Sequence, residues 1–289
     1  MTVEELTMKK NILPKKLFKY FACVLAVTLT AVSFSSCGVS VTPEDAWTQF
    51  ESAVDKSLKS EIYYHKTTRF TENGNFNTKV NVHCNADNEG LIMNPDGSYQ
   101  NFAVYIEEYK DSVMTNAIVC GNSKSSKDGE DKNICVKKNY SDGKFVDADI
   151  TEMKAEDYVK TPEFEKYSLA KQLQELEFLE YSDIDFEKTE KLSFKKNGTV
   201  LLMDFSLKDS YFERYEKSFG KESVLKGSYV QVEISYGRIA KVIVYEKETL
   251  DNNFSSYEEI YRFEVVYLGK NIYVPAYDDE EMKYKWQKT

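Results

Sequence analysis

The stretch SYVQVEISYGRIAKVIVYEKETLDNNFSSYEEIYRFEVVYL, residues 228–268, is rich in Val, Ile, Tyr and Phe, residue types that favour β-structure. Tyr236-Gly237 has the composition of a tight turn between two strands. Strands joined by such a turn pair antiparallel. This part of the chain therefore predicts an antiparallel sheet, with strands at 228–235, 238–250 and 255–268.

A second group of strands follows residue 60, where the apolar period changes from 3.6 to 2. Asn73-Gly74-Asn75 is the turn signal of the first hairpin, and we expect a three-residue loop there. This loop would pair Phe70 with Thr78 and Tyr64 with Cys84. Further strands of this group are expected at 89–93, 98–110, 112–120, 133–139 and 144–150, with a polar loop at 121–132. A separate hairpin is expected later in the chain, where an Asn197-Gly198 turn should join strands at 188–195 and 199–207.

Helical periodicity marks three other segments. Thr42 followed by Pro43 is typical of a helix start, and apolar residues then recur at spacings of three and four. Thr161 and Pro162 repeat this start before a central apolar stripe, and a short helix is expected at 210–219. The two apolar stripes consist of Trp47, Phe50, Val54 and Leu58, and of Phe164, Tyr167, Leu173, Leu176 and Leu179.

Strands with one apolar face need a partner layer, and these helical stripes can supply it. The sequence thus predicts an α+β fold in which a curved antiparallel sheet, a half-barrel, wraps around helices. Where the helices do not fill the curve, an apolar ligand cavity would remain; the alternative is a fully packed core. The candidate cavity residues are Trp47, Phe50, Val54, Tyr64, Phe70, Val80, Val82, Phe102, Val104 and Ile106.

The amino terminus is typical of an export signal. Lysines at 9–19 precede an uncharged apolar run of 15 residues, Tyr20 to Phe34, and then two serines and Cys37. The run is shorter than the ~18 residues that a membrane-spanning helix needs, so we expect cleavage. The expected organisation is a signal peptide at 1–36, with 1–7 as a misassigned extension before Met8, a tether at 37–42 and one binding domain at 43–289.

Phe34-Ser35-Ser36-Cys37 resembles the lipobox of bacterial lipoproteins, in which the cysteine is lipidated and becomes the first mature residue. Phe34 and Ser36 depart from the commonest pattern, which has Leu and then Gly or Ala at these places. The resemblance implies an exported protein held on the outer face of the cytoplasmic membrane, or at the cell surface, by lipid on Cys37. Ordinary signal-peptidase cleavage, which leaves Cys37 as a free thiol, is the alternative.

Charge and cysteine count restrict the partners. Without its first 36 residues the chain loses five lysines and two glutamates, and its formal charge becomes −13. Nucleic acid is therefore not expected as a partner, because nucleic-acid binding requires a basic surface. Cys120 and Cys135 flank one loop and could pair across two strands, either as a disulfide or as free buried thiols, whereas Cys84 is left unpaired.

No group of residues predicts catalysis, a cofactor or a metal site. His65 and His83 would lie opposite each other on the polar face of the first hairpin, but the sequence supplies no third metal ligand. Ser193 and Lys196 have Ser-x-x-Lys spacing, yet on a strand their side chains would point to opposite faces. We therefore expect a protein that is not an enzyme.

The element order resembles that of the LolA-like lipoprotein carrier superfamily, which includes lipoproteins similar to LppX and LprG. The resemblance covers about residues 43–276 and rests on the helix after the lipobox, the strand meander, the central helices and the closing pattern from Val230 to Pro275. It implies a membrane-anchored, non-catalytic binding module that holds a lipid or another apolar ligand in the concavity of its sheet. The alternative is an adhesion or envelope-assembly protein that uses protein or glycan contacts on its outer face and has no internal ligand.

Overall fold

The computed structural model describes residues 38–71, 73–83, 86–87, 90–91, 102–124, 130–219, 227–250 and 254–267 of the 289 residues. The expected signal peptide, Cys37 and Cys84 lie outside these ranges. No helix among the described residues is long and apolar enough to cross a membrane.

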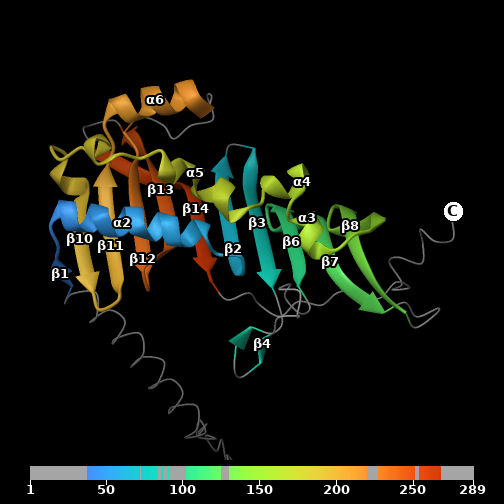
Figure 1. Cartoon of the computed structure of the whole chain (residues 1–289). Helices are drawn as coiled ribbons and strands as arrows, with labels where there is room; N and C mark the ends of the chain where they lie inside the picture. Colours follow the sequence, from blue (N-terminus) through green and yellow to red (C-terminus); the bar gives the residue numbers. More distant parts are fainter. Residues whose placement is uncertain are drawn as a thin grey trace, which may run out of the picture.

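The described strands form one open antiparallel sheet of 12 strands and a separate pair, β4 (Ala86–Asp87) with β5 (Gly90–Leu91). From β2, in the middle of the sheet, the chain builds outward strand by strand to the edge strand β9 (Figure 1). The strands of this half are β2 (Tyr63–Thr71), β3 (Gly74–His83), β6 (Ala103–Lys110), β7 (Val113–Lys124), β8 (Asp131–Ser141) and β9 (Lys144–Glu152).

The second half of the sheet starts at the opposite edge and returns to the middle, where β14 pairs with β2. A short strand, β1 (Val39–Ser40), pairs with β10 and completes the edge. The remaining strands are β10 (Leu192–Asn197), β11 (Val200–Ser206), β12 (Tyr229–Ser235), β13 (Arg238–Leu250) and β14 (Phe254–Val266). The predicted class, an α+β fold with an antiparallel sheet packed against helices, is confirmed.

Most of the helices lie along one face of the sheet, which we call the helix face, and the helix at 209–219 lies beyond the upper ends of the strands in this view (Figure 1). Those between β9 and β10 carry the chain from one edge of the sheet back to the other. The helical elements are α2 (Pro43–Leu58), α3 (Ala155–Tyr158), α4 (Pro162–Glu165), α5 (Leu169–Glu177), α6 (Asp209–Phe219) and the 3₁₀ turns η1 (Tyr181–Asp183) and η2 (Thr189–Lys191).

The predicted helix starts are confirmed by their capping hydrogen bonds. The hydroxyl of Thr42 accepts from the amide of Asp45 at 3.2 Å, and that of Thr161 accepts from the amide of Phe164 at 3.3 Å. The apolar stripes of α2 and of the central helices are buried in one core with the sheet residues. The local pattern thus decided both where these helices begin and which side they bury.

The predicted register of the first hairpin is wrong. Thr71 pairs directly with Gly74, so Tyr64 pairs with Asn81 and Phe70 with Asn75. Gly74 has a φ of 120°, and a Cβ there would lie 2.6 Å from a carboxylate oxygen of Asp111. Only glycine fits this close approach at a positive φ, and β3 begins at Gly74, two residues earlier than a three-residue loop at 73–75 would allow.

This change of register by an odd number moves alternate side chains to the other face. On β2 the odd-numbered residues now point to the helices, together with Val80 and Val82 of β3. Tyr64 and Phe70 lie on the opposite face, which we call the outer face, and 38% of Phe70 is exposed. These two residues are therefore separated from the other candidate cavity residues.

Three other expectations need correction at their ends. The polar loop predicted at 121–132 is shorter, because β7 continues to Lys124 and β8 begins at Asp131. Residues 189–191 form a 3₁₀ turn rather than the start of a strand. Of the strands predicted at 89–93 and 98–110, the structure describes Gly90–Leu91 and Ala103–Lys110. The polar side chains at 121–124 and 131–132 do not prevent strand pairing, since neighbouring strands supply the hydrogen bonds.

Candidate functional site

The candidate site on the helix face is an apolar layer between the sheet and the helices. Eight of the ten residues predicted for a ligand cavity lie in this layer and are buried: Trp47, Phe50, Val54, Val80, Val82, Phe102, Val104 and Ile106. Their burial shows that they pack in one core. Contact of any of them with a ligand stays a prediction.

A cavity remains in this layer between α5, α6, Leu207 and strands β12 to β14. Its volume is about 20 Å³, which is room for one water-sized sphere. None of the ten predicted residues lines it. The lining residues are Gln172, Leu176, Leu179, Leu207, Tyr211, Val230, Val242, Val244 and Tyr261. The sequence signalled Leu176 and Leu179 as part of a buried stripe, but the gap itself depends on how α5 and α6 meet the sheet.

The cavity has one polar end, at the amide group of Gln172. Its Oε1 atom accepts from the hydroxyl of Thr67 at 3.2 Å and from that of Tyr261 at 3.4 Å, while its Nε2 atom donates to the carbonyl of Lys166 at 3.2 Å. The rest of the wall is mainly aliphatic. Such a surface suits a molecule with an apolar body and a polar end.

Helix α6 covers the cavity through aromatic side chains and one ion pair. Tyr211, Phe212 and Tyr215 are buried on its inner side. Arg214 forms a close ion pair with Asp183 of η1, whose side chain is only 2% exposed. The hydrogen bond to Asp183 raises the pKa of the Arg214 guanidinium, so this guanidinium keeps its charge throughout the physiological range.

His65 and Tyr63 of β2 fix the beginning of α5 from the sheet side. The Nε2 atom of His65 lies 2.8 Å from the carbonyl oxygen of Tyr167, and the amide of Leu169 donates to the hydroxyl of Tyr63 at 3.3 Å. His65 is fully buried, and burial lowers its pKa to about 4. It is therefore neutral at pH 7 and donates from Nε2.

The predicted pairing of His65 with His83 is wrong. His65 pairs with Val80 and points to the helix face, whereas His83 pairs with Ala103 and points to the outer face. The cause is the hairpin register described above. Among the described residues no group of three His, Cys, Asp or Glu side chains is placed to hold a metal ion.

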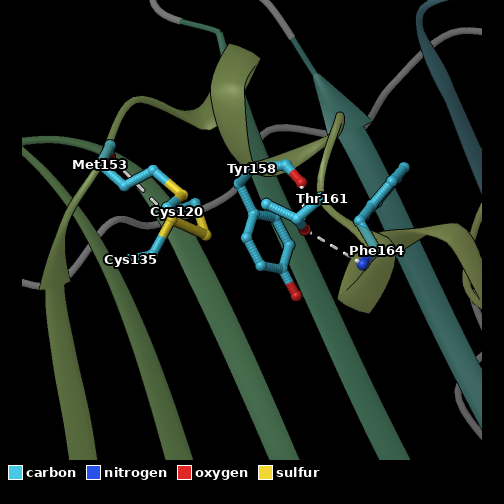
Figure 2. The surroundings of a disulfide bond; sticks show 6 residues. All are labelled: Cys120, Cys135, Met153, Tyr158, Thr161 and Phe164. Carbon is cyan, nitrogen blue, oxygen red and sulfur yellow. Dashed lines mark hydrogen bonds between the residues drawn. A yellow bond between two sulfur atoms is a disulfide. The ribbon is translucent and has the colours of Figure 1, made fainter.

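Cys120 and Cys135 form a disulfide across β7 and β8 (Figure 2). They are direct cross-strand partners with a Cα–Cα distance of 4.0 Å, a pairing that the sequence allowed. Of the two alternatives left open by the sequence, the structure contains the disulfide. The bond is buried on the helix face near Tyr158 of α3. It stabilises the part of the sheet where β7 pairs with β8.

Fold and site together define an α+β protein in which an open antiparallel sheet buries its apolar face under helices and keeps a small cavity between them. No protein-family model matches the chain, and no curated protein sequence matches it. Among solved structures it is similar to LprF from Mycobacterium bovis, with 9% sequence identity over 82% of this chain and 98% of that chain and a TM-score of 0.31. A TM-score of this size supports no conclusion about ligand or activity.

Proposed function

We propose that this chain is an exported lipoprotein, anchored through Cys37 to the outer face of the cytoplasmic membrane, and that it is a non-catalytic binding module for a lipid acyl chain or a similar apolar ligand. The observation that carries the proposal is the apolar cavity under α5 and α6, with the polar group of Gln172 at one end. An acyl chain would lie against Val230, Val242 and Val244, and its polar end would face Gln172.

Binding requires the cavity to enlarge, because ligand sites have volumes of roughly 300–1,000 Å³ and this one has about 20 Å³. Outward movement of α6 would provide the space. This helix is held over the cavity by its aromatic residues and by the pair between Arg214 and Asp183. Side-chain contacts of this kind can be exchanged for contacts with an acyl chain at little cost in buried apolar area.

The position of the sheet relative to the anchor supports the same function. Strand β1 begins at Val39, two residues after Cys37, and pairs with β10. Two extended residues span about 7 Å, so lipidation of Cys37 would hold the β1–β10 edge at the membrane. The cavity lies under β12, β13 and β14, in the half of the sheet that begins at the β1–β10 edge.

The test is a titration of residues 38–289, stripped of lipid, with the fluorescent fatty acid cis-parinaric acid. We expect saturable binding with one site per chain, and acyl lipids in organic extracts of the protein before stripping. Val244→Phe narrows the cavity and should weaken binding at least tenfold, whereas Val146→Phe on β9, where the side chain is 51% exposed, should not change it.

A variant with the opposite expected effect keeps the test independent of folding defects. Arg214→Gln removes the ion pair that holds α6, so it should increase the affinity for cis-parinaric acid severalfold. Circular dichroism would show that each variant is folded. No saturable binding by the wild type and no acyl lipid in its extracts would contradict the proposal.

A further inference from the structure

The outer face of the sheet has a groove over β10, β11, β12 and β13, far larger than the cavity under the helices. Its volume is about 420 Å³. Because alternate residues point to opposite faces, the groove receives the side chains that the core does not use. Those that matter here are Ser193, Leu202, Asp204, Gln231, Glu233 and Lys241.

Asp204 is the unusual residue of this groove. Its Oδ1 atom is shielded from solvent and has no hydrogen-bond partner among the described residues. Its Oδ2 atom has a long contact, 3.5 Å, with the amide nitrogen of Gln231. A buried carboxylate oxygen without a donor is unfavourable. Rotation about the Cβ–Cγ bond exchanges the two oxygens, so a donor placed in the groove can reach either of them.

The charges around Asp204 are balanced. Burial raises the pKa of its carboxyl group, while Gln231 and the nearby ammonium groups of Lys191 and Lys195 oppose that shift. Further along the groove Glu233 forms an ion pair with Lys241 at 3.5 Å. The groove therefore has no large excess of either charge, and it favours a neutral ligand over an ion.

Donors and acceptors alternate along the groove, and apolar atoms lie between them. The groove residues form two rows that run across the strands, and within each row neighbouring residues are direct cross-strand partners. The first row is Ser193, Asp204, Gln231 and Ile243, and the second is Lys195, Leu202, Glu233 and Lys241. Leu202 is 46% exposed. A ligand with many hydroxyl groups fits this surface, since each hydroxyl both donates and accepts and its carbon skeleton can contact Leu202 and Ile243.

An aromatic cluster lies next to the groove residues on the same strands. Tyr229 stacks on Tyr245 with ring centroids 4.6 Å apart, and the ammonium group of Lys191 lies 4.2 Å from the centre of the Tyr229 ring and 4.4 Å from that of Tyr257. Tyr229 and Tyr245 each lie two residues from a groove residue on the same strand. This packing holds the end of the groove rigid, which favours a preformed site.

We propose that the outer groove binds a neutral saccharide, with the carboxylate of Asp204 and the amide of Gln231 hydrogen-bonded to its hydroxyl groups. This site is separate from the apolar cavity, because it lies on the other face of the sheet. The chain would thus contact glycan through its outer face whether or not its helix face holds a lipid.

The test uses residues 38–289 on an array of neutral oligosaccharides, followed by calorimetry with the oligosaccharide that binds. Wild type should bind at least one neutral oligosaccharide. Asp204→Ala should weaken that binding tenfold or more, and the matched control Asp55→Ala, an exposed carboxylate on α2, should leave it unchanged. Leu202→Trp fills the groove from an exposed position, so it should abolish binding in a protein that still folds.

Three results would overturn the proposal: no binding to any neutral oligosaccharide on the array, binding to charged glycans alone, or full binding by both Asp204→Ala and Leu202→Trp. Binding of cis-parinaric acid measured on the same preparations separates the two sites. Loss of saccharide binding in Leu202→Trp with unchanged fatty-acid binding would place the saccharide on the outer face.

Discussion

Acidification should weaken this fold through His65. In the folded protein burial lowers the pKa of this side chain to about 4 from its ordinary value of 6.5. The unfolded chain therefore binds more protons than the folded one between these two pH values, and stability falls as the pH falls. The contribution is fully present above pH 6.5 and is lost progressively toward pH 4; a shift of this size corresponds to about 3 kcal/mol.

The structure explains why the protonated ring is not accommodated. Nε2 donates to the carbonyl of Tyr167, and Nδ1 is buried with no hydrogen-bond partner among the described residues. The ring lies between Tyr63 and Phe263, with centroid distances of 5.7 Å and 5.4 Å. A proton on Nδ1 would place a charge and an unpaired donor in this apolar contact.

The assay is urea unfolding, followed by circular dichroism, at intervals from pH 7 to pH 4. Carboxylates also titrate in this range, so the informative quantity is the difference between wild type and His65→Gln, whose amide can still donate to Tyr167 but does not titrate. That difference should change by about 3 kcal/mol across the range, in favour of the variant at low pH. The variant His83→Gln, on the outer face, measures the contribution of the second histidine separately. A wild type and a His65→Gln variant with parallel pH profiles would refute the argument.

Three further predictions concern the disulfide, a buried hydroxyl and the anchor. Replacement of both Cys120 and Cys135 by Ser should lower the free energy of unfolding by about 3 kcal/mol, the value for a loop of this length, and an unchanged urea midpoint would argue against a structural role of the bond. Ser57→Ala should cost about 1–3 kcal/mol, because the buried Ser57 hydroxyl donates to the carbonyl of the residue four positions earlier and accepts from the amide of Ile239 at 3.0 Å; Ser60→Ala, at a less buried site on the same turn, is the control in thermal melts. Cys37→Ala should abolish incorporation of labelled palmitate and release the protein from the membrane fraction, and equal labelling of both forms would show that Cys37 is not the lipidated residue.

Local features of the chain could be predicted from sequence because they depend on neighbours in the chain. Thr42 with Pro43 marks a helix start wherever the helix is packed, and Tyr236-Gly237 forms its turn because both residues adopt a positive φ, 50° and 72°. The strand from Arg238 to Leu250 has the predicted limits. The cross-strand pairing of Cys120 with Cys135 was compatible with the sequence, but the choice between a disulfide and free thiols was not decided by it.

The ends of one turn illustrate what the sequence left undecided. Asn73-Gly74-Asn75 indicates a turn, but the number of residues in it depends on the contact of Gly74 with Asp111, which is 37 residues away in the chain. The loop is one residue shorter than predicted, and this difference in loop length decided whether Tyr64 or His65 faces the helices. No local pattern contains that information.

The sequence by itself determined the class of fold, because alternating strands and amphipathic helices must bury their apolar sides against each other. The tertiary structure alone decided where space remains. The cavity under α6 and the groove around Asp204 are each made by side chains from at least four separate elements. Their volumes, and the unpaired Oδ1 atom of Asp204 in the groove, depend on how those elements meet, and that arrangement is a property of the packed molecule as a whole.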